Sequence, residues 1–298
     1  MEFRVLQYFL AIAREESISA AAEALHITQP TLSRQIKELE DEFGKQLFVR
    51  GNRKITLTEE GMLLRKRAEE ISSLVEKTQL EMSAVDNELN ADIYIGGGET
   101  QGMRFITKAI QRMQAQYPMV RFHLYSGNAE DVGDRLDKGL LDFGVLIEPA
   151  NMTKYDFIKL PTKDVWGVLM RKDSPLAKNA YITPDDLIGQ PIIYSAQRMV
   201  NNIISGWMKK DYDKLSLIAS YNLIYNASLM VEDGAGYALS LEGLINTTGD
   251  SPLCFRPLQP KLEVGLAFVW KKYQVFSKAS EYFLKELQKE VNEENETV

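Results

Sequence analysis

The sequence has few of the side chains that catalytic and metal sites use. Its 298 residues include one cysteine, Cys254, and two histidines, His26 and His123. A single thiol excludes an internal disulfide and a zinc site made of four thiolates. No Ser–His–Asp or Cys–His set can be assembled from these residues, so we expect a protein that is not an enzyme and that binds no metal.

The sequence also lacks a complete nucleotide-binding fingerprint. A glycine run that starts at Gly96 follows an expected strand and precedes an expected helix, as it does in dinucleotide-binding proteins. The last glycine of that fingerprint is replaced by Gln101, so the pattern fails. We therefore expect no cofactor.

Long apolar runs are missing as well. No stretch of about 18 apolar residues occurs, which predicts that the chain has no membrane span. The first ten residues, MEFRVLQYFL, lack the basic start, apolar core and cleavage site of a secretion signal. The expected location is therefore the cytoplasm.

Positive charge is scarce overall and unevenly placed. The formal net charge is −7, but residues 1–58 hold eight cations and eight anions, so residues 59–298 carry the whole excess. Four cations and no anion lie between Phe43 and Thr58. This strip favours a small nucleic-acid-binding domain joined to an acidic body, although chance clustering on a solvated surface gives the same pattern.

The first 44 residues predict three short helices. Apolar residues recur at helical spacing over residues 3–14, and an alanine-rich helix is expected over 20–25 with Ser19 as its N-cap. A third helix is expected over 28–43, capped by Thr28 and ended by a glycine. Its expected apolar face consists of Leu32, Ile36, Leu39 and Phe43.

Two helices joined by a tight turn, the second polar in its N-terminal half, are what a helix-turn-helix needs to place a recognition helix in the major groove. Glutamine, serine and threonine can read base edges, while arginine and lysine bind phosphate or guanine. A hairpin with a basic tip over residues 50–54 follows, which suits the DNA backbone or the minor groove. An ordinary three-helix structural domain is the alternative. The expected DNA-binding residues are Gln29, Pro30, Thr31, Ser33, Arg34, Lys37, Arg50, Arg53 and Lys54.

Residues 59–89 predict one long helix that Thr58 caps. Its apolar residues step by four and three over about 25 residues, a heptad pattern that favours pairing with a second copy of the chain. A stripe packed on its own chain is the alternative. The expected dimerisation residues are Leu64, Ala68, Ile71, Val75, Met82 and Val85.

From residue 90 the pattern changes to alternating strands and helices, which predicts an α/β parallel sheet. Two sets of strands and helices indicate two subdomains with a cleft between them. Subdomain I is expected over 90–161 and 266–298, and subdomain II over 162–265.

Three expected helices of this body begin with polar residues, which makes their N-termini candidate ligand sites. The candidates are Thr100, Gln101, Asn128, Ser195 and Gln197, and plain helix capping is the alternative for each of them. Glu99 and Glu148 lie close to the expected cleft and would repel an anion. The sign of the ligand's charge therefore stays open.

The run from Ser19 to Gly61 resembles the N-terminal signature of the LysR-type transcriptional regulators. Glu60 departs from the pattern, because the family more often has a small residue there. Residues 117–146 and 231–240 also resemble the effector-binding half of these regulators. The matching positions in the first run are Ala21-Ala22, Leu25, Gln29-Pro30, Ser33, Ile36, Leu39-Glu40, Leu47-Phe48, Arg50, Leu57-Thr58 and Gly61.

The resemblance implies a winged helix-turn-helix that is mainly α over 1–58, a linker and dimerisation helix over 59–89, and a periplasmic-binding-protein-like α/β effector domain over 90–298. It implies a ligand-responsive, sequence-specific transcription regulator that activates, represses or does both. The implied partners are double-stranded DNA with a two-fold site, further copies of the chain as a dimer of dimers, a small-molecule effector of unknown identity, and RNA polymerase. A solute-binding receptor-like protein is the alternative, since the body alone would fit one.

Overall fold

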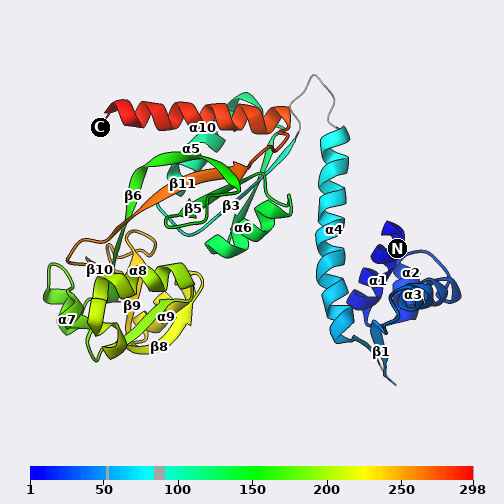
Figure 1. Ribbon diagram of the computed structural model, residues 1–298, viewed down its shortest axis with the longest axis horizontal. Helices are drawn as coiled ribbons and strands as arrows, with labels where there is room; N and C mark the ends of the chain where they lie inside the picture. Colours follow the sequence, from blue (N-terminus) through cyan, green and yellow to red (C-terminus); the bar gives the residue numbers. More distant parts are fainter. Residues whose placement is uncertain (52–53, 84–90, 298) are drawn as a thin grey trace. The chain divides into compact units, whose positions relative to one another are not determined.

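The computed structural model describes residues 1–51, 54–83 and 91–297. The chain forms two compact units, Met1–Ser83 and Ala84–Val298, here called unit 1 and unit 2 (Figure 1). Within the described residues, no helix combines the length and the apolar character needed to cross a bilayer.

Unit 1 packs four helices and a two-stranded wing around one apolar core. Fully buried side chains of the first three helices, among them Leu6, Phe9 and Leu32, form this core, and Ala68 from the long fourth helix completes it. The three predicted helices and the hairpin are confirmed. The elements are α1 (Phe3–Glu15), α2 (Ile18–Ala24), α3 (Gln29–Phe43), β1 (Phe48–Arg50), β2 (Ile55–Leu57) and α4 (Glu59–Ser83).

The ends of the short helices correct two expectations. Ser17 caps α2 by accepting a backbone N–H at 3.3 Å, and Ser19 lies inside the helix, which begins earlier than the alanine run suggests. Phe43 was expected in the core but is 42% exposed, because it occupies the last turn of α3, next to Gly44. Gly44 ends α3 in the left-handed conformation (φ 62°), as predicted.

Hydrogen bonds between a side chain of α3 and the backbone of the wing hold the wing against the end of α3. The Glu40 carboxylate accepts the N–H groups of Leu47 at 2.8 Å and Phe48 at 3.2 Å. Gly61 in α4 packs so closely that an added Cβ would lie 2.1 Å from the carbonyl oxygen of Leu47. The helix and the wing therefore have a fixed spacing, and only glycine fits at position 61.

Glu60 fits the start of α4. Thr58 caps this helix as predicted, with its hydroxyl accepting the Gly61 N–H at 2.9 Å. Glu60 lies 3.4 Å from Lys45. The helix N-terminus, through a backbone hydrogen bond, and then Lys45 lower the pKa of the Glu60 carboxyl. The departure from the family pattern is therefore locally compatible with the fold.

Unit 2 is built on one mixed nine-stranded sheet with the order β4-β3-β5-β11-β6-β9-β7-β8, and β10 pairs with β6. A wholly parallel sheet was expected, but β11 and β6 run antiparallel to their neighbours. The strands are β3 (Asp92–Gly97), β4 (Arg121–Ser126), β5 (Phe143–Ile147), β6 (Tyr155–Arg171), β7 (Pro191–Ser195), β8 (Ser216–Tyr221), β9 (Tyr237–Leu241), β10 (Leu253–Pro257) and β11 (Glu263–Lys271). The helices are α5 (Met103–Gln116), α6 (Ala129–Asp137), α7 (Pro184–Leu187), α8 (Arg198–Met208), α9 (Ile224–Glu232) and α10 (Lys278–Thr297), with 3-10 turns η1 (Pro175–Lys178) and η2 (Lys209–Lys214).

The long strand β6 connects the first half of this sheet, which contains β4, β3, β5 and β11, to the second half, which contains β9, β7, β8 and β10. Its residues 155–165 pair with β11, and residues 166–171 pair with β9 and β10. Within β6, an apolar run typical of a buried strand occurs only over residues 165–170. The first part of β6 contains lysines, a proline and aspartates and mixes buried, half-buried and exposed positions, so its apolar pattern is weak.

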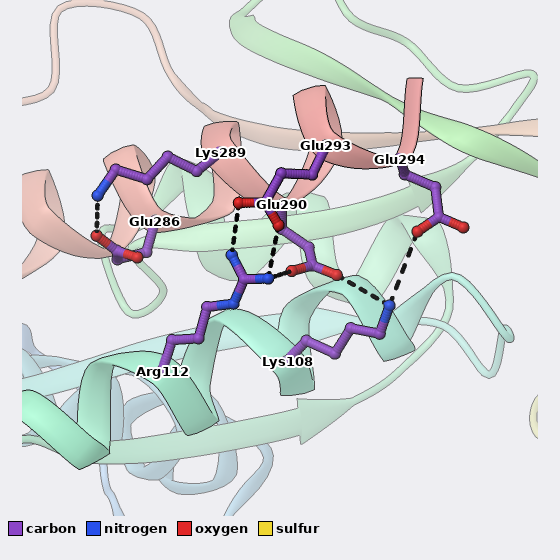
Figure 2. A network of polar contacts seen from close by, with 7 residues as sticks. All are labelled: Lys108, Arg112, Glu286, Lys289, Glu290, Glu293 and Glu294. Atoms are coloured by element: carbon purple, nitrogen blue, oxygen red, sulfur yellow. Dashed lines mark hydrogen bonds and ion pairs between the residues drawn. The ribbon is translucent and has the colours of Figure 1, made fainter. Parts of the chain in front are cut away.

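The C-terminal helix α10 packs on α5 and returns the chain to the first half of the sheet. Figure 2 shows the charged contacts between the two helices. The Glu290 carboxylate is 4% exposed and lies 2.9 Å from Lys108 and 2.7 Å from Arg112. Arg112 also donates two hydrogen bonds to Glu293. Because a buried carboxylate without its cations is costly, this network fixes α10 in place.

Candidate functional site

The polar face of α3 is the first candidate site, and the structure leaves it exposed. Five of the six predicted residues on this helix are exposed, and Ser33 is half-buried. The opposite face, with Leu32, Ile36 and Leu39, is buried in the core of unit 1. The exposed residues are Gln29, Pro30, Thr31, Arg34 and Lys37.

The N-terminus of α3 carries no side-chain cap. Thr28 occupies the N-cap position as predicted, but its hydroxyl shares a hydrogen bond of 2.9 Å with the hydroxyl of Thr31. Pro30 lies in the first turn, where its missing N–H has no cost. A helix that begins this way can bring its first backbone N–H groups close to a phosphate.

Two described cations of this surface make exposed ion pairs. Arg34 lies 3.7 Å from Glu38, and Lys54 lies 2.9 Å from Glu16. Exposed pairs of this kind contribute about 0–1 kcal/mol, so these cations can exchange their partners for phosphates. Arg50 ends β1, and the predicted contact Arg53 lies outside the described residues.

The predicted dimerisation stripe on α4 divides into two parts. Leu64 and Ala68 pack against the core of their own unit, and Ala68 is fully buried there. Farther along the helix, Ile71 is 37% exposed and Met82 is 82% exposed, while Val75 is half-buried. Leu63 and Leu74 are further exposed apolar residues of the helix. Val85 lies outside the described residues.

The second candidate site is a cavity of about 90 Å³ between the two halves of unit 2. On the same measure a single water needs roughly 10–15 Å³, so the cavity has room for roughly six to nine water-sized groups. Asn128 lines it from the first half, and Ser195 and Gln197 line it from the second. These three residues are therefore brought together as the sequence suggested.

Thr100 and Gln101 line a neighbouring, more open hollow instead. Thr100 is buried, and its hydroxyl accepts the Gly102 N–H at 3.0 Å. Burial raises the pKa of the adjacent Asp164 carboxyl, while the Thr100 hydroxyl and the Gln101 backbone N–H lower it. The Gln101 amide donates to the carbonyl oxygen of Gly243 at 2.5 Å and so bridges the two halves. In this structure Gln101 is a brace between the halves, whereas the Thr100 hydroxyl makes a local contact within its own loop.

The N-terminal N–H groups of two helices beside the cavity are already paired. The Asn128 side chain caps α6, and the Gln197 amide oxygen accepts the Ala129 N–H across the cavity at 3.4 Å. Glu99 reaches from the first half to the second and accepts the Ile224 N–H, at the start of α9, at 2.6 Å. Of the helix starts that were expected to receive an anion, the start of α6 is thus taken by the protein's own acceptors, whereas α8 begins without a side-chain cap.

Most of the cavity wall is apolar and was not identified from the sequence. Trp166 lies on β6, and Tyr221 ends β8 with its hydroxyl donating to the Leu239 carbonyl oxygen at 2.6 Å. Burial, with a contribution from Glu99, raises the pKa of Tyr221. A single sequence gives no signal that separates such residues from ordinary core residues. The other apolar lining residues are Ala129, Val145, Ile147, Pro149, Val200, Ile203, Leu223, Ile224, Leu241, Leu244 and Val264.

Neither candidate site contains a metal-binding group. Across the described ranges, no three His, Cys, Asp or Glu side chains are grouped so that they could hold a metal ion. Cys254 is buried in β10, and this burial raises the pKa of its thiol. A buried thiol with a raised pKa is a poor nucleophile.

Comparisons with known proteins cover both units. Residues 3–62 match the family model of the bacterial regulatory helix-turn-helix proteins, lysR family, and residues 86–292 match the LysR substrate binding domain. The Hca operon transcriptional activator HcaR of Escherichia coli (strain K12) is 27% identical over 278 residues, which are 91% of this chain and 92% of that protein. An uncharacterized HTH-type transcriptional regulator of Bacillus subtilis (strain 168), YvbU, is 28% identical over 244 residues, which are 81% of this chain and 82% of that protein.

Solved structures share the fold over nearly the whole chain. The crystal structure of CbnR, a LysR family transcriptional regulator, has a TM-score of 0.75 at 15% identity and covers 98% of this chain and 99% of that chain. Full-length CbnR complexed with its target DNA has a TM-score of 0.74 at 16% identity and covers 97% of this chain and 100% of that chain. At these identities the likeness concerns the fold alone.

Proposed function

This chain belongs to the LysR family of bacterial transcriptional regulators, and from that premise we propose a role for each of its parts. Residues 1–58 bind DNA, residues 59–89 join two copies of the chain, and residues 90–298 hold a small-molecule effector. The protein acts in the cytoplasm and has no enzymatic activity of its own. Family membership replaces the solute-receptor alternative, because such a receptor would not need a helix-turn-helix.

The observation that carries the DNA-binding role is the exposed polar face of α3 beside the wing. With α3 in the major groove, Gln29, Thr31 and Ser33 read base edges. Arg34 and Lys37 bind phosphate or guanine. The basic wing over 50–54, with Arg50, Arg53 and Lys54, follows the backbone or enters the minor groove.

The exposed apolar part of α4 supports pairing between two copies. Ile71, Leu74 and Met82 leave apolar surface open on the part of the helix beyond the core contacts of Leu64 and Ala68. A second α4 covers this surface and places two recognition helices on a two-fold DNA site. Two such dimers form a tetramer. An effector that alters unit 2 then changes the spacing of the DNA-binding pairs and the access of RNA polymerase.

The effector occupies the cavity between the halves of unit 2. Asn128, Ser195 and Gln197 contact it, Gln101 braces the two halves that close around it, and Thr100 fixes the loop that carries Gln101. The cross-cavity hydrogen bonds of Glu99 and Gln197 support this role, because a molecule bound between them affects both halves at once.

Selection of DNA sequences from a random pool tests the pairing and the DNA-binding role together. We expect the full-length protein to enrich a two-fold motif and to sediment as a dimer or tetramer. The variant Ile71→Asp with Met82→Asp places two charges on the proposed contact, so it should sediment as a monomer and lose the two-fold motif. The matched control is Lys66→Gln with Ser73→Asp, which changes the net charge of α4 by the same amount at two exposed positions outside the apolar stripe and should keep both properties. If the wild-type chain recovers no motif at low salt, the DNA-binding role is wrong.

A further inference from the structure

The cavity in unit 2 differs from an anion site in the charges that line it. Three lining residues are glutamates, namely Glu99, Glu130 and Glu148, and no lysine, arginine or histidine is among the lining residues that the structure describes. Glu99 and Glu148 are half-buried, whereas Glu130 is exposed at the rim. An anion placed here would face like charges in a partly desolvated space, which disfavours its binding.

The backbone donors at the starts of α6 and α9 are already used, whereas α8 begins without a side-chain cap. At α6 the side-chain oxygen Oδ1 of Asn128 accepts two N–H groups and Gln197 accepts a third. At α9 the first N–H is held by the Glu99 carboxylate. At α6 and α9 a ligand anion would have to displace one of these acceptors, and at α9 the acceptor is itself a carboxylate of the chain.

The same cavity has the groups that bind a positive charge. The aromatic residues Trp166 and Tyr221 line it together with Glu99 and Glu148. Aromatic faces and carboxylates both attract ammonium groups, most strongly where water is excluded. Trp166 is 3% exposed, and no hydrogen-bond partner for its indole Nε1 exists among the described residues. A buried donor of this kind lacks an acceptor, and a protonated amine cannot supply one, so the bound molecule also carries an acceptor atom apart from its amine.

We propose that the effector is a small organic cation, an apolar body that carries a protonated amine and a hydrogen-bond acceptor, and that Glu99 and Glu148 select its charge. This inference rests on the proposed effector role of the cavity. Glu99 is the stronger determinant, because its carboxylate also bridges the two halves through the Ile224 N–H. A cation bound to Glu99 therefore acts at the contact that sets the separation of the halves.

Three probes of matched size test the charge preference on the full-length protein. Benzylamine is a cation at neutral pH, benzyl alcohol is uncharged, and benzoate is an anion. Each has about the number of non-hydrogen atoms that the cavity's roughly six to nine water-sized positions allow. In calorimetric titrations we expect benzylamine to bind at least about tenfold more tightly than benzyl alcohol, with benzoate the weakest of the three.

The variant Glu99→Gln removes the charge and keeps an oxygen that can accept the Ile224 N–H. It should reduce the preference for benzylamine over benzyl alcohol by about tenfold and leave the affinity for benzyl alcohol nearly unchanged. Glu148→Gln provides a second, independent test if Glu99→Gln fails to fold. Glu281→Gln, an exposed position on α10, makes the same chemical change away from the cavity and should keep the wild-type preference.

Three results would overturn the inference: benzoate binding as tightly as benzylamine, glutamine variants that keep the full preference, or no binding of any probe at millimolar concentration. The proposed function is judged separately on the same preparations by protection of a two-fold DNA site. A chain that protects DNA but prefers benzoate is a regulator whose effector class was wrongly assigned. If the chain prefers benzylamine but protects no DNA, the proposed ligand class is supported and the proposed regulatory function is wrong.

Discussion

Replacing Phe9 by alanine is expected to unfold unit 1 and abolish DNA binding while unit 2 keeps its fold. Phe9 is fully buried in α1, and its ring centroid lies 5.1 Å from that of Phe48 in the wing. Removal of such a ring costs about 3–5 kcal/mol, which is a large share of the stability of a small domain. The two compact units have separate cores, so the loss stays in unit 1. Calorimetry should show one transition that disappears or shifts to low temperature and another that is unchanged.

The control for this substitution is Phe43→Ala. It makes the same chemical change in the same unit, but Phe43 is 42% exposed at the end of α3. We expect this variant to lose less than about 1 kcal/mol and to keep its DNA binding. If the two variants behave alike, or if Phe9→Ala still binds DNA with full affinity, the described core of unit 1 is incorrect.

Gln29→Ala and Arg34→Gln are expected to impair DNA binding in two different ways. Gln29 is exposed on the face that we assign to base readout, so its loss should cost about 1–3 kcal/mol on the preferred site and relax the preference at one base pair in each half-site. Arg34 is assigned to the backbone or guanine, and its loss should weaken binding to most sequences. The salt dependence should also fall, by about one unit of slope for each phosphate that the variant no longer neutralises.

Measurements of affinity against salt, on the selected motif and on a scrambled duplex, separate these two effects. Lys285→Gln changes the net charge by the same amount on α10 of unit 2 and should leave both quantities as in the wild type. Unchanged affinity and unchanged preference in Gln29→Ala would remove the base-reading role of that residue. An unchanged slope in Arg34→Gln would exclude its contact with phosphate.

The sequence alone was sufficient to predict those helices and strands for which the local sequence signals agree with the burial of the side chains. The recognition helix has an apolar face, a proline in its first turn and a terminal glycine, and the structure places it over Gln29–Phe43. The start of α2 was misplaced, because Ser17 and Ser19 are both good caps and only packing decides between them. Phe43 was misplaced because helical spacing identifies a face of the helix but not where the neighbouring elements end.

In unit 2 the sequence predicted the elements better than the pairing between distant strands. The strand–helix alternation predicted the α/β architecture, but the first part of β6 was missed because only Tyr155 and Leu160 of its apolar residues are buried and its pairing with β11 holds it in the sheet. The same pairing makes the sheet mixed. Antiparallel partners far apart in the chain leave no local signature in the sequence.

The sequence predicted a cleft between the two halves of unit 2, but it identified only some of the residues that line the cavity there. Residues at helix N-termini, such as Asn128 and Gln197, can be found from capping patterns, and both line the cavity. Trp166 and Tyr221 cannot be found in this way, because they lie on strands as ordinary apolar residues do. The charge of the site also could not be predicted, since it depends on Glu99 reaching across to Ile224.

The most direct test of the regulatory function is a nuclease footprint of the purified full-length chain on the DNA upstream of its own coding region. The account predicts a protected two-fold site at roughly 50 mM salt, and protection that weakens by about a thousandfold or more near 200 mM, because salt ions compete with the protein at several phosphates at once. Absence of protection at the lower salt, combined with a random pool that enriches no motif, would contradict the assignment of α3 and the wing to DNA.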